Sequence, residues 1–248
     1  KCDCGKVIST DFSSLNKTKT RSCGCLQKES VKNTGLTNRR YTINPDKLVD
    51  NDVTAYIAGL YAADGSNEKS GISISLQSID QNILLKISSY FDYTGTIYSI
   101  VRSKSTEQNQ VRLTISDPSF RKFFEERGVI KNKTKDYVVP EIYLKNSHFW
   151  RGFLDGDGCI FKYNRKYPVY GVSLVGTKNT IHSFKEFGEF VLHKSIKVKP
   201  YKIKSSIDVY SINFVGKMYM PVIEALYGNP VDHMYIDRKY KKYLELKT

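Results

Sequence analysis

Two stretches of the chain share one pattern of apolar, small and acidic positions. Residues 55–66 read AYIAGLYAADGS, and residues 148–161 read HFWRGFLDGDGCIF. Each stretch predicts an apolar helix that ends at an aspartate followed by a glycine. The two superpose at an offset of 93 residues, so that Asp64 corresponds to Asp157. This correspondence indicates an internal duplication.

Small residues in both helices predict that the helices pack against each other. Gly59 and Ala63 are four residues apart, as are Gly152 and Gly156, and this spacing places each pair on one helix face. Such a face is bare and lets another backbone approach closely. Gly158 is expected to adopt a positive φ and to end the second helix.

The rest of the pattern predicts the same order of elements in each half. In the first half, residues 71–78 alternate apolar with polar positions, as in a strand with two different faces. A helix at 80–91, strands at 94–103 and 110–116, and a helix at 118–128 complete this half. In the second half we predict strands at 160–165 and 169–175, a helix at 177–191, strands at 195–203 and 207–214, and helices at 218–227 and 236–247. The predicted fold class is therefore α+β, a duplicated αββαββα unit with antiparallel sheets and pseudo-two-fold symmetry.

The composition favours a polyanion as partner. The chain has 248 residues with 40% hydrophobic content, enough for one or two sizeable cores. Lys and Arg number 39 against 25 Asp and Glu, a formal net charge of +14, and 18 Tyr and 12 Phe are interleaved with this charge. This combination fits nucleic acid. No run of about 18 apolar residues predicts a membrane span, and the start KCDCGK has no apolar signal core, which favours an intracellular, reducing setting.

Four of the five cysteines form two close pairs near the start of the chain. Cys2 and Cys4 lie in CDCG, and Cys23 and Cys25 lie in CGC, with eighteen residues between Cys4 and Cys23. In a reducing compartment such pairs favour a structural zinc site over free thiols or disulfides, although the spacing differs from the commoner CxxC. Cys159 is expected to be a small apolar filler.

The chain is expected to divide into four parts. Residues 26–50 are polar and basic without clear periodicity, which indicates either a solvated linker or an arm that follows DNA phosphates. The predicted parts are a zinc-binding module over 1–30, a basic linker over 31–50, and two duplicated subdomains over 51–145 and 146–248.

The aspartates at the two helix ends require a nearby cation. A helix C-terminus carries partial negative charge, so an acid there is unfavourable by itself. If the bare helix faces pack together, Asp64 and Asp157 come side by side at adjacent C-termini. Divalent cations that prefer oxygen ligands, such as Mg²⁺, relieve this accumulation of negative charge. Two carboxylates that hold magnesium in a basic chain suit phosphodiester hydrolysis.

The paired segments IAGLYAADG (Ile57 to Gly65) and WRGFLDGDG (Trp150 to Gly158) resemble the two signature helices of single-chain LAGLIDADG homing endonucleases. The resemblance implies a monomeric pseudo-dimer that cuts both strands of a long target site in double-stranded DNA with Mg²⁺ or Mn²⁺. It also implies that Asp64 and Asp157 are metal ligands, each assisted by the backbone carbonyl of the preceding residue. Those residues are Ala63 and Gly156.

The resemblance further implies a lysine near the metals in each half, behind the last helix of the repeat. In the first half the candidate is Lys133, with Lys131 as second choice. In the second half it is Lys239, with Arg238 as second choice.

By a looser match, a polar residue at the end of the second strand is expected to orient water. The first half offers Gln77 or Ser78, whereas the second offers Thr177 or Lys178. This difference argues against equal activity of the two halves.

The first acid of the signature differs between the copies, with Ala62 in the first and Asp155 in the second. The resemblance implies a structural role at this position. We therefore expect Asp155 to cap the helix or to pair locally.

The polar faces of the strands are expected to form a basic surface with interspersed aromatic rings. A sheet of this size fits the major groove of B-DNA, although solvation alone also accounts for one polar face. The residues assigned to this surface are Lys162, Tyr163, Arg165, Lys166, Lys197, Lys199, Lys202 and Lys204.

Three other classes of protein remain open. They are an RNA-binding intron maturase, a non-cleaving DNA-binding regulator on the same scaffold, and a zinc-ribbon nucleic-acid binder with an unrelated second domain. The first two would tolerate loss of Asp64 or Asp157, and the third leaves the duplicated helices unexplained. The sequence thus favours a site-specific double-strand DNA endonuclease of the kind that acts in intron homing.

Overall fold

The computed structural model describes residues 1–9, 22–30, 41–68, 71–101, 108–130, 137–163, 168–203 and 208–247. The chain divides into two compact units, Lys1–Thr42 and Ile43–Thr248. In the first unit, residues 25–30 form a short helix, so the prediction of an irregular segment from residue 26 onward is wrong there. Residues 31–40 of the predicted linker lie outside the described residues.

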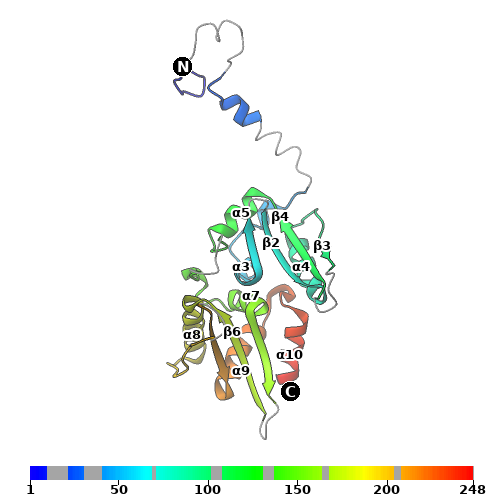
Figure 1. Ribbon diagram of the computed structural model, residues 1–248, viewed down its shortest axis with the longest axis vertical. Helices are drawn as coiled ribbons and strands as arrows, with labels where there is room; N and C mark the ends of the chain where they lie inside the picture. Colours follow the sequence, from blue (N-terminus) through cyan, green and yellow to red (C-terminus); the bar gives the residue numbers. More distant parts are fainter. Residues whose placement is uncertain are drawn as a thin grey trace. The chain divides into compact units, whose positions relative to one another are not determined.

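The second unit consists of two halves with the same order of elements, which confirms the predicted α+β duplication (Figure 1). The first half contains α3 (Asp52–Asp64), β1 (Gly65–Glu68), β2 (Gly71–Gln77), α4 (Gln81–Tyr90), β3 (Tyr98–Ile100), β4 (Gln110–Ile115) and α5 (Pro118–Glu125). The second half contains α7 (Ser147–Asp157), β5 (Gly158–Tyr163), β6 (Val169–Gly176), α8 (Lys178–Leu192), β7 (Tyr201–Lys202), β8 (Tyr210–Val215), α9 (Tyr219–Tyr227) and α10 (Asp237–Lys247). Of the helices in the described ranges, none is both long and apolar enough to cross a bilayer.

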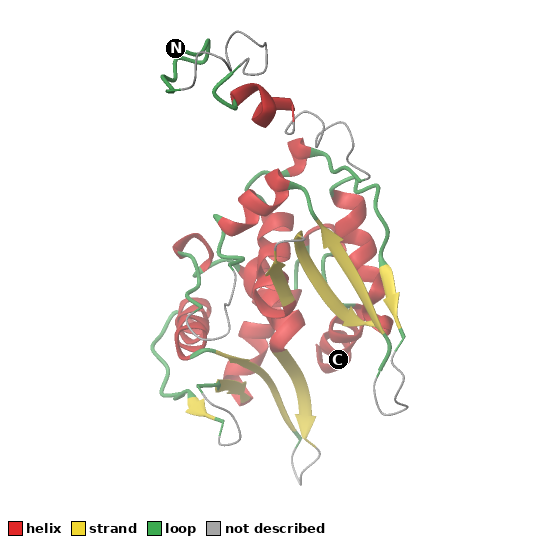
Figure 2. Ribbon diagram, turned by 45° about the horizontal axis from the view of Figure 1, so that its top comes forward, coloured by secondary structure: helices red, strands yellow, loops and turns green. Residues whose placement is uncertain are grey.

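Each half holds one antiparallel sheet (Figure 2). The strand orders are β1-β2-β4-β3 in the first sheet and β5-β6-β8-β7 in the second. On the inner face of each sheet, alternate side chains such as Ile72, Ile74, Val172 and Leu174 are buried in the core. In the second half, α8 and α9 pack against this inner face. Each sheet therefore has an inner face toward the helices and an opposite, outer face.

Two strands differ from the predictions for identifiable reasons. β1 was not predicted, because its inward positions hold Gly65 and Asn67 in place of apolar side chains. The Asn67 side-chain nitrogen is paired in the core, where it donates to Glu125 Oε1 and to the Val129 carbonyl oxygen, both at 2.9 Å. The predicted strand 195–203 is paired only over β7, directly after Pro200, which has no N–H to donate to a neighbouring strand.

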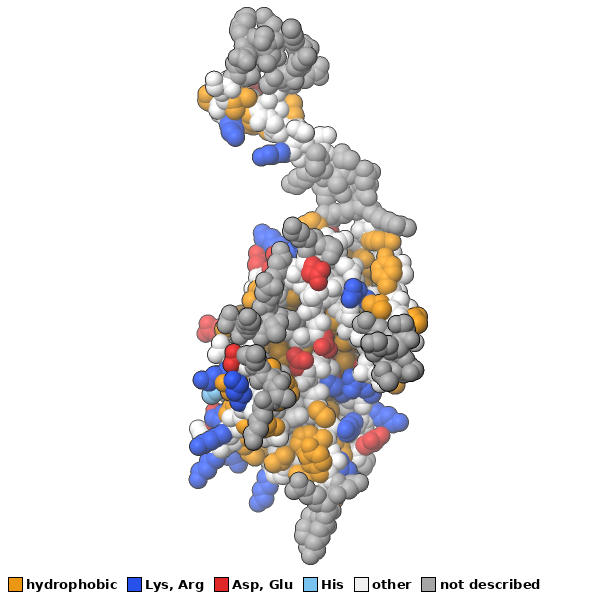
Figure 3. Space-filling view, in the orientation of Figure 1, with side chains coloured by type: hydrophobic (Ala, Val, Ile, Leu, Met, Phe, Trp, Pro, Cys, Tyr) orange, Lys and Arg blue, Asp and Glu red, His pale blue; other side chains and the backbone are white. Residues whose placement is uncertain are grey.

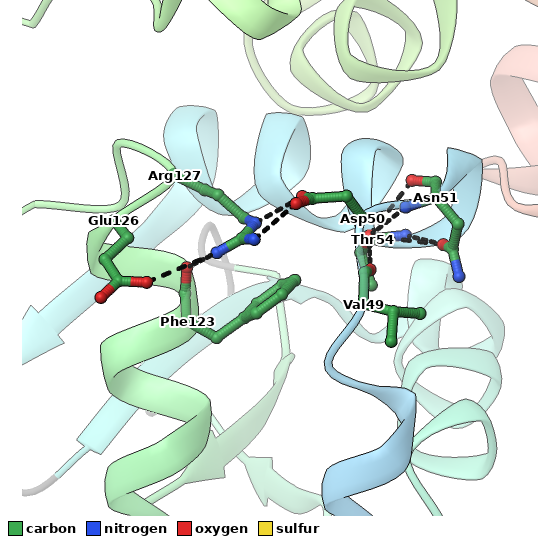
Figure 4. Close-up of polar contacts among 7 residues, drawn as sticks. All are labelled: Val49, Asp50, Asn51, Thr54, Phe123, Glu126 and Arg127. Carbon is green, nitrogen blue, oxygen red and sulfur yellow. Dashed lines mark hydrogen bonds and ion pairs between the residues drawn. The ribbon is translucent and has the colours of Figure 1, made fainter.

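Polar contacts fix the start of α3 (Figure 4). The Asn51 side chain accepts a hydrogen bond from the Thr54 amide at 2.9 Å, and the Thr54 hydroxyl accepts one from the Asn51 amide at 3.1 Å, forming a capping box. Next to it, Arg127 donates to both oxygens of Asp50 at 2.6 and 2.7 Å and lies 3.5 Å from the centre of the Phe123 ring. These hydrogen bonds from Arg127 hold the pKa of Asp50 below its usual range. The residues after α5 thus anchor the helix that carries Asp64.

α3 and α7 lie in direct backbone contact. A Cβ on Gly59 would lie 2.0 Å from the Phe149 carbonyl oxygen, and a Cβ on Gly152 would lie 2.0 Å from the Tyr56 carbonyl oxygen. No side chain fits at either position, which confirms that the bare faces of the two helices pack together.

The positions after the two helices require glycine because a side chain would not fit there, and not because the backbone has a positive φ. Gly65 has φ −78° and Gly158 has φ −104°, both extended, so the predicted positive φ of Gly158 is wrong. A Cβ on Gly158 would lie 2.4 Å from the Leu154 side chain, and one on Gly65 would lie 2.6 Å from the Tyr61 carbonyl oxygen. Each helix therefore turns directly into a strand and leaves its last aspartate at a fixed place.

Candidate active site and cysteine cluster

Asp64 and Asp157 are the last residues of α3 and α7, and both are exposed. Asp64 lies beside the end of α7, because its Oδ2 is 3.1 Å from the place that a Cβ on Gly156 would take. The same Cβ would lie 2.4 Å from Ala63 Cβ, so the two helix ends meet at these small residues. Acidic side chains gather over this meeting point in Figure 3. The structure thus places all four predicted metal-site residues at one junction.

A cavity of about 230 Å³ opens beside Asp157. Its lining comes from both halves, with Ala62 and Ala63 from α3 and with Asp157 and Asp208 from the second half. Asp208 was not singled out from the sequence, since it lies in an irregular segment before β8 without a motif. The Asp208 carboxylate forms an ion pair with the ammonium group of Lys202 in β7 at 3.3 Å.

Lys239 places its ammonium among the carbonyl groups that end α7. Its Nζ donates to the carbonyl oxygens of Leu154 at 2.6 Å, Asp155 at 2.6 Å, Gly158 at 2.8 Å and, at the longer distance of 3.5 Å, Gly156; the residue is 5% exposed. Burial lowers the pKa of Lys239, whereas the negative charges of Asp155 and Asp64 act to raise it. Lys239 is therefore a cation at the negative end of α7, where the aspartates required one.

Asp155 is buried and binds residues that are distant in sequence. Its carboxylate accepts hydrogen bonds from the hydroxyls of Tyr56 at 2.7 Å and Tyr227 at 2.6 Å, and from the Ile236 amide at 2.9 Å. Burial raises the pKa of Asp155, although Lys239 and the three donors act to lower it. The expectation of a local cap or pair is wrong, because these partners lie in α3, in α9 and just before α10. Asp155 thereby positions the segment that carries Lys239.

The other predicted helper residues lie in different surroundings. Gln77 ends β2 and is exposed. Thr177 is the N-cap of α8. Its hydroxyl accepts a hydrogen bond from the Thr180 amide at 3.2 Å and donates one to the Tyr137 carbonyl oxygen at 3.1 Å. Arg238 pairs with the buried carboxylate of Asp80 at 3.0 Å. Lys133 and its alternative lie outside the described residues.

The predicted basic strand surface is wrong for Lys162 and for Lys202, which the pairing of β7 with β8 places opposite Tyr210 on the inner side. The pairing of β5 with β6 places Lys162 opposite Tyr170 on the inner side, with its Nζ 5.3 Å from the centre of that ring. Tyr163 and Cys159 point to the outer face, because a shift of one residue along a strand reverses the face. Cys159 is exposed there and is not a buried filler. Outside the described residues lie Arg165, Lys166 and Lys204.

In the first unit, four thiols converge. The Sγ atoms of Cys2, Cys4, Cys23 and Cys25 all lie within 4.8 Å of one another. The Sγ distances are 3.6 Å for Cys2 to Cys25 and 3.3 Å for Cys4 to Cys23, well beyond the roughly 2.05 Å of a disulfide bond. Sulfurs at about 2.3 Å from a tetrahedral zinc ion would be about 3.8 Å apart. Hydrogen bonds from the amides of Cys4 and Cys23 lower the pKa of Cys2 to about 6.

Comparisons with known proteins agree with this architecture. Residues 51–128 match the family of the LAGLIDADG-like domain. The chain is similar to the structure of the I-LtrWI LAGLIDADG homing endonuclease bound to target DNA, with a TM-score of 0.54, 15% identity, and coverage of 79% of this chain and 88% of that chain. It is also similar to the LAGLIDADG meganuclease I-AabMI bound to uncleaved DNA, with a TM-score of 0.53, 12% identity, and coverage of 80% and 89%. A third similar structure is the homing endonuclease I-WcaI bound to its DNA recognition sequence, with a TM-score of 0.52, 13% identity, and coverage of 86% of this chain and 91% of that chain.

These likenesses define the fold: the chain has the LAGLIDADG fold, with two antiparallel sheets and the paired helices α3 and α7 between the halves. Among curated proteins, it is 24% identical over 227 residues to the ATP-dependent DNA helicase Hel308 of Thermococcus kodakarensis. The alignment covers 82% of this chain, but the chain spans only 19% of that protein's length.

Proposed function

We propose that the chain is a site-specific, metal-dependent DNA endonuclease that cuts both strands of its target, as homing endonucleases do. The observation that carries this proposal is the pair of exposed carboxylates, Asp64 and Asp157, at the touching ends of α3 and α7. The net charge of +14 supports a polyanionic substrate. Structures with the same fold bound to DNA support duplex DNA as that substrate.

The residues at the helix junction fit a divalent metal with a preference for oxygen. Asp64 and Asp157 offer carboxylate oxygens, and Ala63 and Gly156 offer the adjacent carbonyl oxygens. Both helix C-termini add negative potential at this point. These ligands suit Mg²⁺ or Mn²⁺, which would supply activation of water and stabilisation of the leaving oxygen.

Each half then acts on one DNA strand, but the two halves differ in the side chains that lie near their aspartate. In the second half, Lys239 neutralises the end of α7 and holds the α7 backbone that carries Asp157. In the first half, Lys133 is the proposed counterpart. Gln77 faces outward at the end of β2 and is the proposed water-orienting residue, whereas the Thr177 hydroxyl is occupied by backbone partners. We therefore expect the first half to be the better equipped for orienting water.

We also propose that Cys2, Cys4, Cys23 and Cys25 bind one structural Zn²⁺ ion. The spacing of their thiols matches a tetrahedral four-sulfur site. Each pair of cysteines is next to a glycine with positive φ, Gly5 at 89° and Gly24 at 93°, which lets the backbone turn around the thiols. Such an ion would stabilise a unit too small to build a large core of its own.

The nuclease proposal is tested with the full chain and a plasmid library that carries randomised targets. With magnesium we expect linear products cut at discrete sites, and without added magnesium we expect binding without cleavage. Asp232 is exposed beside a second cavity, which shares no residue with the one at Asp157, and its φ of 44° is one that Asn also tolerates. Asp232→Asn is therefore a suitable control that should cut like the native chain. Binding of DNA or structured RNA without cleavage under any metal condition would favour the regulator or the maturase.

The zinc proposal is tested by metal analysis of the purified full chain. We expect about one zinc per chain, and loss of that zinc in Cys4→Ser and Cys23→Ser. Cys159→Ser is the matched control and should retain it, because Cys159 lies in the other unit. Zinc-free protein whose four cysteines all react with a thiol reagent would contradict the proposal.

A further inference from the structure

The outer faces of the two sheets carry different chemistry. In the first sheet, strand pairing places three polar pairs on the outer face of the central strands. They are Ser73 with Thr114, Ser75 with Arg112, and Gln77 with Gln110. Hydroxyl, amide and guanidinium groups thus dominate the outer face of these central strands.

In the second sheet, the outer face is divided. At one end of the central strands Ser173 pairs with Asn213 and Val175 with Ser211, whereas the other end is apolar. Phe161 lies across Gly171, where a Cβ would be 2.4 Å from the Phe161 ring and 2.9 Å from Val215. The Tyr163 ring is 4.7 Å from the Phe161 ring, and Val169 pairs with Tyr163. We call Phe161, Tyr163, Val169 and Val215 the apolar patch. Figure 3 shows hydrophobic side chains gathered over β5 and β6 on this face.

Positive charge is concentrated in the same half as the apolar patch. Residues 146–248 hold 17 Lys and Arg against 9 Asp and Glu, whereas residues 51–145 hold 12 against 11. Lys197 and Lys199 are exposed before β7, whereas Lys202 in β7 is exposed on the inner side of the sheet, opposite Tyr210. A partner for this half must therefore offer both negative charge and small apolar groups. An apolar protein surface would supply only the second.

Duplex DNA supplies both in its major groove. Phosphates line the groove, and the C5-methyl group of thymine is its apolar feature, which Phe and other apolar side chains contact. Hydroxyl, amide and Arg groups, as on the first sheet, instead read hydrogen-bonding edges, with Arg suited to guanine. The asymmetry of the two outer faces thus matches two different modes of base reading.

We propose that the apolar patch packs against thymine methyl groups, so that the half of the target under the second sheet is rich in thymine. The half under the first sheet is read through hydrogen bonds. This inference rests on the DNA binding proposed above and adds to it the chemical identity of the bases that each sheet selects. It makes the two half-sites different in kind and not only in sequence.

The test begins with selection of duplexes from a randomised library by the full chain without added magnesium. The best duplex is then remade with deoxyuridine in place of thymidine in one half-site at a time, which removes the methyl groups and keeps the base pairing. We expect substitution in one half-site to weaken binding about fourfold per contacted methyl, the factor for burial of one methyl-sized group, and substitution in the other half-site to have little effect.

Two reciprocal variants assign the sensitive half-site to a sheet. Val215→Thr keeps the shape of the side chain and adds a hydroxyl to the apolar patch, so it should reduce the penalty for deoxyuridine in the sensitive half-site. Thr114→Val makes the opposite change on the first sheet and should leave that penalty unchanged. Selective binding that is indifferent to deoxyuridine in both half-sites would overturn the inference and leave the proposed DNA binding intact. Absence of any selective duplex binding would overturn both.

Discussion

α3 and α7 occupy equivalent places in the two halves but differ in the polar side chains that they carry. The small residues at the interface and the final aspartates are the same in kind in both helices. At the offset of 93 residues, however, three alanines of α3 correspond to three polar residues of α7: Ala55 to His148, Ala58 to Arg151 and Ala62 to Asp155. The duplication therefore preserves the junction of the helices while each helix is adapted to its own half.

The polar residues of α7 tie it to the C-terminal part of the second half. Arg151 is fully buried and donates to the carbonyl oxygens of Met234 at 2.8 Å and Leu226 at 3.1 Å. Together with the hydrogen bonds of Asp155, these contacts hold the segment between α9 and α10, and thereby the start of α10, from which Lys239 reaches the end of α7. α7 therefore depends on buried polar pairing more than α3 does.

The largest expected effect comes from Asp155→Ala. This change leaves two buried tyrosine hydroxyls and a buried amide without their shared acceptor. It also removes the larger of the two carboxylate charges that act on Lys239, so we expect a loss of about 3–5 kcal/mol in the free energy of unfolding. Urea unfolding measures it. Glu186→Ala, on the exposed side of α8, is the control and should change stability little. A loss below about 1 kcal/mol for Asp155→Ala would show that α7 is no more dependent on polar pairing than α3.

Gly59→Ala and Gly152→Ala test the feature that the two helices share. A Cβ at either position meets a backbone carbonyl oxygen of the partner helix at 2.0 Å, so the helices must separate, and we expect each change to cost about 3 kcal/mol. Gly176→Ala is the matched control, because its Cβ would make an ordinary contact with Thr180 at 3.4 Å. Thermal unfolding of the three variants gives the comparison. Equal stability of all three would rule out the backbone contact.

Lys239→Met tests whether the end of α7 needs its cation. The change removes charged hydrogen bonds to four carbonyl oxygens, so we expect a loss of about 2 kcal/mol and weaker cutting of one DNA strand. Lys241→Met, an exposed position on the same helix, should alter neither property. Stability and strand nicking are measured on the same preparations, and a variant with native values for both would remove Lys239 from the account.

The smallest expected effect is a pH dependence of the free energy of unfolding that arises from His148 in α7. Burial, followed by the charge of Arg151, lowers the pKa of His148 below its ordinary value of 6.5. The unfolded chain therefore binds a proton that the folded chain does not, and this contribution to stability is lost as the pH falls from about 6.5 toward the lowered pKa. A plot of the free energy of unfolding against pH should be flatter for His148→Gln than for the native chain in this window. His182→Gln changes an exposed residue and should leave the plot unchanged. Parallel plots for the native chain and His148→Gln would contradict the role of His148.

The sequence predicted the helix junction because the information for it is local and appears twice. Gly59 and Gly152 mark the bare faces, and the repeat fixes Asp64 against Asp157. The partners of Asp155 could not be predicted, since they lie 72 to 99 residues away and depend on tertiary packing.

The faces of the strands were harder to predict for a different reason. Lys162 and Tyr163 are neighbours on one strand and cannot share a face, and only the pairing of β5 with β6 decides which of them points outward. The apolar patch around Phe161 was therefore not visible in the sequence.

Cleavage of the selected target by Asp64→Asn and Asp157→Asn shows whether each helix end contributes one metal-binding carboxylate to a double-strand cut. We expect each single change to abolish double-strand cutting in magnesium, while the affinity for the target stays close to that of the native chain. Double-strand cutting at the native rate by either variant would contradict this expectation.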